Sequence, residues 1–273
     1  MKKLLIVLSL IALMAGCSNI QSKEEKKEKT SEPASKVQEQ QVVKDDETKQ
    51  EAETVVTEVT KIEPLYEINQ KNWSVVPIGD ADAHIVLLTV DDAPDKHALE
   101  MAHTLSGLGV KAIFFVNGHF LDTEEEANVL KEIHNLGFPI GNHTYSHRNL
   151  KDLNEEEQIQ EIISVNDRVE EIIGERPKFF RAPFGVNTDV SRKVVADEKM
   201  ILMNWTYGYD WEKDYQSKEA LADIMVNTPF LKNGANLLMH DRAWTNEALA
   251  DIVKGIQAKG FEMVDPNLIR TIE

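Results

Sequence analysis

Short apolar runs alternate with segments of helical apolar spacing along most of the chain, from residue 63 to the C-terminal end. Each run is rich in Val, Ile, Leu or Phe and is bounded by polar or turn-forming residues, which is typical of a buried strand. Strands that alternate with helices indicate an α/β fold with a mostly parallel sheet or a β/α barrel. The predicted strands cover residues 85–89, 112–116, 139–142, 179–181, 201–204, 236–239 and 261–264.

Three of the predicted helices have a clear boundary in the sequence. The longest follows Asn154, a good N-cap residue, and ends at Gly174, a residue type that favours the left-handed conformation of a helix C-terminus. A second helix begins with the capping-box pattern of Thr123 and Glu126. A third covers the apolar positions of 249–256 and ends at Gly260.

Residues 1–17 have the pattern of an export signal. Two lysines precede an apolar run of about twelve residues, which would rise only about 18 Å as a helix, whereas a bilayer core is about 30 Å thick. A cleaved signal peptide is therefore favoured over a transmembrane anchor. Ala15 and Gly16 before Cys17 resemble the lipobox of bacterial lipoproteins, which implies a lipid at Cys17 and an extracytoplasmic, membrane-anchored protein; the alternative is an incidental cysteine.

Residues 18–62 differ sharply in composition from the rest of the chain. They are rich in Lys, Glu, Gln, Thr and Ser, and they contain no aromatic residue. Such a segment buries too little apolar surface to offset the entropy of ordering it, so we expect a disordered polar tether. Residues 63–273 remain as the expected catalytic domain.

Composition and charge narrow the function classes. The chain has 273 residues, of which 42% are hydrophobic, so one sizeable core can form. A formal net charge of −17 argues against a nucleic-acid-binding surface, because such a surface needs clustered Lys and Arg. Cys17 is the only cysteine, which excludes an intramolecular disulfide.

Titratable and aromatic residues follow five of the predicted strands. In parallel β/α folds, functional side chains gather at the C-terminal ends of the strands, so these residues are expected to meet at one edge of the sheet. They are Asp91 and Asp92, His143 and His147, Arg181, Asp210 and Trp211, and His240.

The two histidines and the two aspartates indicate a metal site. His143 and His147 are four residues apart, which on a helical turn would place both imidazoles on one face. Two imidazoles and a carboxylate with one open position form a catalytic zinc arrangement, although a surface pair or helix cap has the same spacing. Asp91 and Asp92 can form a simple turn, but adjacent carboxylates at a buried strand end repel each other, and a cation would relieve that cost.

The motifs, taken in order, resemble those of the NodB-type polysaccharide deacetylases, which are carbohydrate esterase family 4. The resemblance covers residues 85–264 and implies a distorted (β/α) barrel with seven or eight strands. The matching segments are Thr89-Val-Asp-Asp-Ala-Pro94, His143-Thr-Tyr-Ser-His147, Arg181-Ala-Pro-Phe-Gly185, Asp210-Trp211 and Leu238-Met-His240. Val90, Ala93 and Tyr207 depart from it, because Phe, Gly and a second Asp are usual at these places.

The resemblance assigns a role to each motif residue. It implies a divalent metal, zinc before cobalt or nickel, held by Asp92, His143 and His147. Asp91 would be the general base, oriented by Arg181. His240 would be the general acid, tuned by Asp210. Trp211 and Leu238 would line the pocket for the acetyl methyl group, and the backbone N–H of Phe184 would face the oxyanion.

The expected activity is removal of N-acetyl groups from the amino sugars of a cell-wall or cell-surface glycan, either peptidoglycan or a chitin-like polymer. The expected partners are this glycan and, through the lipid at Cys17, the membrane; we expect a monomer. One alternative is a surface lipoprotein that binds glycan without turnover. The other is an amidohydrolase or O-acetyl esterase on the same scaffold.

Overall fold

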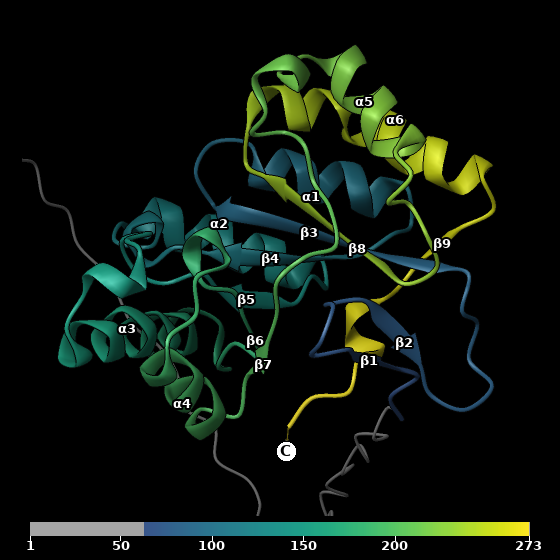
Figure 1. Ribbon diagram of the computed structural model, residues 1–273. Coiled ribbons are helices and arrows are strands. Elements are labelled where there is room, and N and C mark those ends of the chain that lie inside the picture. Colours follow the sequence, from purple (N-terminus) through teal and green to yellow (C-terminus); the bar gives the residue numbers. More distant parts are fainter. Residues whose placement is uncertain (1–62, 273) are drawn as a thin grey trace, which may run out of the picture. The chain divides into compact units, whose positions relative to one another are not determined.

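The computed structural model describes residues 63–272 (Figure 1). The predicted signal peptide, the lipidation site at Cys17 and the tether lie outside these residues and stay predictions. Within the described part of the chain, no helix is both long enough and apolar enough to cross a membrane.

A parallel sheet forms the centre of the described region, with strand order β7-β6-β5-β4-β3-β8 and with β9 paired to β3 (Figure 1). A separate antiparallel hairpin joins β1 (Tyr66–Ile68) and β2 (Val75–Pro77). The strands of the large sheet are β3 (Ile85–Ala93), β4 (Ala112–Val116), β5 (Ile140–Asn142), β6 (Phe179–Phe180), β7 (Ile201–Leu202), β8 (Ala235–His240) and β9 (Glu262–Met263).

The two edges of the sheet are joined by the segment that follows β7. The backbone N–H of Thr206 donates to the carbonyl of Asn236 at 2.8 Å, and that of Leu238 donates to the carbonyl of Tyr207 at 2.9 Å. These bonds connect the β7 side of the sheet with β8, so the sheet curls into an irregular barrel. The expectation of a distorted (β/α) barrel is confirmed.

Six α-helices accompany the strands of the described region. One begins at the predicted capping box of Thr123, and another begins after the predicted N-cap residue Asn154. Each of these two side chains accepts from the backbone N–H three residues later. Gly174 ends its helix at φ 83°, in the left-handed region. The helices are α1 (Ala98–Gly107), α2 (Glu124–Asn135), α3 (Glu155–Ile173), α4 (Asp189–Asp197), α5 (Lys218–Asn227) and α6 (Ala243–Ala258).

Alternation along β3 separates two parts of the core. Val86, Leu88 and Val90 pack in the cluster that contains the buried faces of α1, α2 and α6. Ile85 and Leu87 belong to a second cluster, which lies inside the curled sheet and is covered by the β1–β2 hairpin. Because successive side chains of a strand point to opposite faces, Thr89 and Asp91 continue the inward series. The pattern of β3 thus directs Asp91 toward the interior at the C-terminal edge.

Candidate active site

One pocket at the C-terminal edge of the sheet collects the predicted site residues. Arg181 lies beneath the pocket and is completely buried. The side chains that line it are Asp91, Asp92, His143, His147, Ala182, Phe184, Trp205, Asp210, Trp211, Gln216, Leu238, His240, Arg242 and Trp244.

A bulge in β3 brings both aspartates into the pocket. Adjacent residues of a regular strand point to opposite faces, which would direct Asp92 away from Asp91. The pairing register shifts between Val90 and Ala93, and Asp92 has a left-handed backbone with φ 59°. This irregularity allows both carboxylates to line one pocket. The strand is longer than predicted, and the aspartates lie within it rather than in a turn after it.

Asp92, His143 and His147 form a cluster with the chemistry of a metal site. One ligand atom from each residue lies within 4.8 Å of the other two. Oδ1 of Asp92 is 3.4 Å from Nε2 of His147 and 3.8 Å from Nε2 of His143. The same carboxylate oxygen therefore faces both imidazoles. One carboxylate and two imidazoles match the donor set of open catalytic zinc sites.

The two histidines lie in an irregular loop, and the prediction of a helical turn is wrong. Thr144 and His147 have φ values of 66° and 56°, which a right-handed helix does not contain. Side chains from neighbouring elements hold the loop instead. The amide of Asn117 donates to the carbonyl of His143 at 2.7 Å, and Glu161 of α3 accepts from the backbone N–H of Ser146 at 2.8 Å.

His143 is held in a neutral form with a fixed tautomer. Its Nδ1 lies 2.7 Å from the carbonyl oxygen of Arg181, which can only accept, so Nδ1 carries the hydrogen. Nε2 therefore presents its lone pair toward Asp92. Burial lowers the pKa of His143 to about 3, helped by the charge of His147 and opposed by Asp92. Fixing the tautomer from outside the ligand set is common around metal-binding histidines.

Asp91 and Arg181 form a buried ion pair. Nη1 of Arg181 is 2.6 Å from Oδ1 of Asp91, and it also donates to the hydroxyl of Thr89 at 2.8 Å. Nη2 donates to the carbonyl of Asn204, and the guanidinium lies 4.3 Å from the centre of the Phe115 ring. Burial raises the pKa of the Asp91 carboxyl, and the neighbouring guanidinium opposes part of that rise. The second oxygen of Asp91 faces His143 at 3.6 Å.

His240 and Asp210 form a second dyad at the pocket. Oδ1 of Asp210 lies 2.7 Å from Nδ1 of His240, while Oδ2 accepts from the His240 backbone N–H and from the Thr245 hydroxyl. Burial lowers the pKa of His240, but the hydrogen bond and charge of Asp210, with Asp91 and Asp92, outweigh it, so the net shift is upward. His240 is the β8 partner of Asp91 in the sheet.

Aromatic and apolar side chains complete the walls. Trp211 meets the His240 ring edge-on, with 5.6 Å between ring centres, and lines the pocket with Leu238. Phe184 has φ 58°, is 63% exposed, and meets His147 edge-on at 4.9 Å. Trp244 also lines the pocket, and its indole N–H donates to the carbonyl of Asp210 at 2.8 Å.

The three departures from the family pattern are accommodated in the structure. Ala93 does not have a positive φ; the left-handed residue of this loop is Asp92. Val90 packs toward the helices rather than into the site. Tyr207 is buried, and its hydroxyl donates to the carbonyl of Met225 at 2.9 Å. None of these three side chains lines the pocket.

Two charged residues of this region were missed from the sequence. Nη2 of Arg242 lies 2.7 Å from Oδ2 of Asp92. The other oxygen of this carboxylate, Oδ1, is the one that faces the histidines. The buried carboxylate of Asp241 accepts from four consecutive backbone N–H groups, those of residues 95–98, at the start of α1. The sequence carries one signal for both, which is their position directly after His240 at a strand end.

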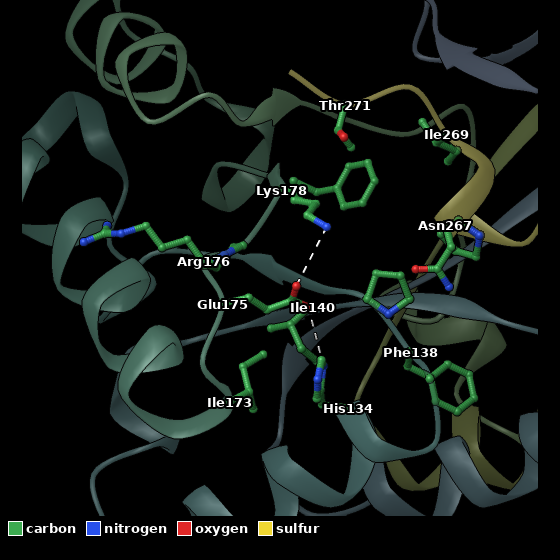
Figure 2. A pocket seen from close by; sticks show the side chains of 15 residues that line it. His134, Phe138, Ile140, Ile173, Glu175, Arg176, Lys178, Asn267, Ile269 and Thr271 are labelled. Carbon is green, nitrogen blue, oxygen red and sulfur yellow. Dashed lines mark ion pairs between the residues drawn. The ribbon is translucent and has the colours of Figure 1, made fainter. Parts of the chain in front are cut away.

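A second pocket lies at the other edge of the sheet, beside the N-terminal ends of β5 and β6 (Figure 2). Glu175 lies within 3.8 Å of both His134 and Lys178 there, as the dashed lines of Figure 2 mark. These three side chains are partly exposed and pair with one another. Buried charged groups distinguish the pocket around Asp91, which is therefore the candidate active site.

Comparison with known sequences agrees with this geometry. The family profile described as polysaccharide deacetylase matches residues 78–203. A peptidoglycan-N-acetylglucosamine deacetylase from Bacillus cereus is 31% identical over 196 residues, which cover 68% of this chain and 68% of that protein.

Two solved structures share the fold; one is an esterase and the other is a pseudoenzyme. A family 4 carbohydrate esterase from Streptomyces lividans, in complex with acetate, has a TM-score of 0.60 at 25% identity, covering 66% of this chain and 92% of that one. A pseudoenzyme of the same family from Bacillus anthracis also has a TM-score of 0.60, at 26% identity, covering 69% of this chain and 67% of that one.

Proposed function

The chain belongs to the polysaccharide deacetylase family, and on that basis we propose that it is a metal-dependent hydrolase that removes N-acetyl groups from the amino sugars of a cell-wall or cell-surface glycan. Peptidoglycan and chitin-like polymers are the substrate classes considered. One observation carries the proposal: a candidate metal cluster, a carboxylate–arginine pair and a histidine–carboxylate pair surround a single pocket.

The residues at the cluster fit a divalent cation. Asp92 supplies an oxygen, and His143 and His147 supply nitrogens, a set that suits zinc and also cobalt or nickel. The neutral state of His143 and its fixed tautomer support the assignment, because a protonated imidazole does not ligate. When bound, such a cation polarises the acetyl carbonyl and lowers the pKa of water beside it.

Asp91 acts as the general base in this proposal. Its Oδ1 is held by Arg181, which leaves Oδ2 facing the pocket to accept a proton from the attacking water. A raised pKa makes the carboxylate a stronger base than an ordinary aspartate at the same site. Arg181 is a positioning residue, since its guanidinium is buried and contacts Asp91 rather than the pocket.

His240 acts as the general acid. An amine is a poor leaving group until it is protonated, and an imidazolium can supply that proton near neutral pH. Asp210 accepts from Nδ1 of His240, so Nε2 carries the proton that is donated. Asp210 also favours the charged form, which explains the raised pKa of His240 despite its burial.

The remaining groups of the pocket bind the acetyl group and stabilise negative charge. Trp211 and Leu238 present an apolar surface beside His240, where a methyl group can be buried. The backbone N–H of Phe184 is assigned to the developing oxyanion. One such donor typically contributes about 2.7–4 kcal/mol to transition-state stabilisation.

A non-catalytic glycan-binding protein is the second candidate, because the chain is also similar to a family pseudoenzyme. Binding alone requires neither the buried Asp91–Arg181 pair nor the His240–Asp210 pair. Both pairs hold charges away from water, which costs free energy even when the groups are partnered. Such pairs are therefore more typical of functional sites than of simple packing. Their joint presence supports the hydrolase.

Acetate release from acetylated chito-oligosaccharides, peptidoglycan and acetylxylan tests the activity. We expect the zinc-loaded chain to release acetate from an amino-sugar substrate, and we expect a chelator or Asp91→Asn to abolish the release. Equally low release by the wild type and Asp91→Asn in added zinc would favour the binding protein. Release from acetylxylan alone would assign an O-acetyl esterase. Ring opening of a small cyclic amide, with no acetate released from any of the three polymers, would assign an amidohydrolase.

We further propose that a lipid at Cys17 anchors the protein at the outer face of the membrane. The lipobox-like sequence before Cys17 and the polar composition of residues 18–62 support this location. Cys17→Ser should shift the protein from the membrane fraction to the soluble fraction of expressing cells. Retention of this variant in the membrane fraction would contradict lipid anchoring.

A further inference from the structure

Arg242 is a cation on the wall of the pocket. It precedes α6, and its side chain is 38% exposed. Among the described residues that line this pocket, it is the one lysine or arginine. Its Nη2 contacts Oδ2 of Asp92 at 2.7 Å, and its Nη1 donates to the carbonyl of Asp241 at 3.1 Å. The guanidinium is thus held beside the candidate metal cluster.

The two arginines of the site differ in whether their N–H donors can reach a ligand in the pocket. Arg181 is fully buried and donates to Asp91, Thr89 and Asn204. Arg242 is partly exposed toward the pocket, and a guanidinium has five N–H donors in a planar fork. Two of these donors have partners among the described residues, so others can take an acceptor from the pocket. Planar carboxylates fit such a fork well.

Arg242 offers a positive charge to an anionic ligand in an otherwise acidic protein. The chain carries a formal charge of −17, so its overall field does not attract anions. Asp92 is the acidic partner of Arg242, and a divalent cation on Asp92 would compete for the same negative charge. Asp91 and Asp210 are each paired with another group, Arg181 and His240 respectively. The positive charge of Arg242 therefore remains available to a ligand when the cluster is loaded.

We propose that Arg242 forms an anion subsite that selects acetylated amino sugars carrying a carboxylate close to the acetamido group. The inference rests on the proposed function, because it assumes that the acetamido group lies between Asp91 and His240. Arg242 contacts Asp92 directly. In the proposed reaction the acetyl carbonyl lies beside the cation on Asp92, so the Arg242 guanidinium can reach a neighbouring substituent of the same sugar. A lactyl ether on the carbon next to the acetamido carbon, as in N-acetylmuramic acid, places a carboxylate at that range.

A pair of matched substrates isolates the charge. The first is an N-acetylmuramic-acid-containing oligosaccharide with a free lactyl carboxylate, and the second is its methyl ester, which has the same sugar without the charge. A third, in which a short peptide is joined to the lactyl group, distinguishes a lactyl carboxylate from a carboxylate on the peptide. The readout is the ratio of kcat/KM for acid over ester with the zinc-loaded full chain.

We expect the wild type to prefer the acid by about tenfold, as a charge-assisted hydrogen bond of about 1.4 kcal/mol gives. Arg242→Gln should bring the ratio close to one, while Arg242→Lys should keep part of it because it retains a charge without the fork. Raising the salt concentration should lower the ratio for the wild type and leave that of Arg242→Gln unchanged. Arg270→Gln is the matched control, since Arg270 is an exposed arginine paired with Glu67 at 2.7 Å outside this pocket, and it should keep the wild-type ratio.

Two kinetic results would overturn the anion subsite. One is equal treatment of acid and ester by the wild type. The other is a loss of activity in Arg242→Gln that is proportionally the same for both substrates, which would mean that Arg242 acts only by orienting Asp92. Calorimetric binding of acid and ester to the zinc-loaded chain separates this inference from the proposed function. Tighter binding of the acid that Arg242→Gln abolishes supports the subsite even without turnover, and no difference in binding contradicts it.

Discussion

Two buried aspartates of the pocket have different partners, which suits the different tasks proposed for them. Asp91 is paired with the permanently charged guanidinium of Arg181, which holds one oxygen and leaves the other toward the pocket. Asp210 is paired with the titratable imidazole of His240 through Oδ1, and its Oδ2 accepts from the backbone N–H of His240. Pairs of groups whose surroundings favour opposite protonation states are typical of acid–base sites.

Replacing Asp210 tests the acid at the residue scale. The Asp210 charge raises the pKa of His240, so Asp210→Asn should lower it, and the protonated acid should be lost at a lower pH. We expect the alkaline limb of the kcat/KM profile to move to lower pH, while the acidic limb, assigned to Asp91, moves less. The pH dependence of acetate release measures both limbs.

The control for this variant is Asp223→Asn, which removes an exposed carboxylate of α5 that contacts only Asn227 among the described residues. It should leave both limbs in place. An alkaline limb that stays fixed in Asp210→Asn would contradict the assignment of His240 as the acid.

The residues that follow strands were the part of the site most predictable from the sequence. Asp91, Asp92, His143, His147 and His240 were all expected to meet, and the structure brings them to one pocket. The partner of Arg242 could not be assigned, because its contact with Asp92 joins residues 150 positions apart; its position after a strand end indicates only that it belongs to this region. The pairing depends on the alignment of β3 with β8, which only the folded sheet establishes.

At the scale of elements, the loop with His143 and His147 depends on α3 for its shape. Glu161 of α3 accepts from the backbone N–H and the hydroxyl of Ser146, between the two histidines. Its own carbonyl accepts from the N–H of Tyr145. A helix with a predictable capping box thus supports a loop whose left-handed residues were not predictable from spacing.

Removing this support should weaken metal binding without touching a proposed ligand. Glu161→Ala leaves Ser146 without its side-chain partners, so the loop loses part of its preorganisation. We expect zinc affinity to fall by about tenfold, at the lower end of outer-shell effects. Competition with a zinc-binding dye measures the affinity. Glu156→Ala on the exposed start of α3 is the control, and equal affinities in both variants would show that Glu161 does not organise the site.

Asp241 connects β8 with α1 across the sheet edge. Its carboxylate accepts from the four N–H groups of residues 95–98, so it caps α1 from a distant part of the chain. The same connection holds the segment between Asp92 and α1 beside His240. Local capping patterns were found for α2 and α3, whereas this cap is supplied by a residue more than 140 positions away and could not be predicted.

Loss of this cap should lower the stability of the folded protein. Asp241→Ala leaves several backbone N–H groups without their acceptor, and we expect the free energy of unfolding to fall by about 2–3 kcal/mol. Urea denaturation measures this change. Asp251→Ala removes a surface carboxylate paired with Lys218 at 3.1 Å and should change stability by less than about 1 kcal/mol. Similar losses in both variants would contradict the role given to Asp241.

For the whole molecule, alternating strands and helices were sufficient to predict an α/β fold, and the family resemblance to predict a barrel. The closure of the barrel could not be deduced from pattern, because it depends on irregular backbone at Thr206 and Tyr207 rather than on a full strand. The β1–β2 hairpin was also missed, since each of its strands has only three residues. The curled sheet leaves its charged, buried groups at one edge, where the proposed chemistry takes place.

We infer that Asp92, His143 and His147 hold one divalent cation, whereas His240 serves the reaction without holding it. Elemental analysis of zinc per chain after dialysis tests this most directly, on the wild type and on His143→Ala and His240→Ala. We expect one zinc per chain for the wild type and His240→Ala, and a large loss of metal for His143→Ala. Equal loss of metal in both variants, or full metal content in His143→Ala, would contradict it.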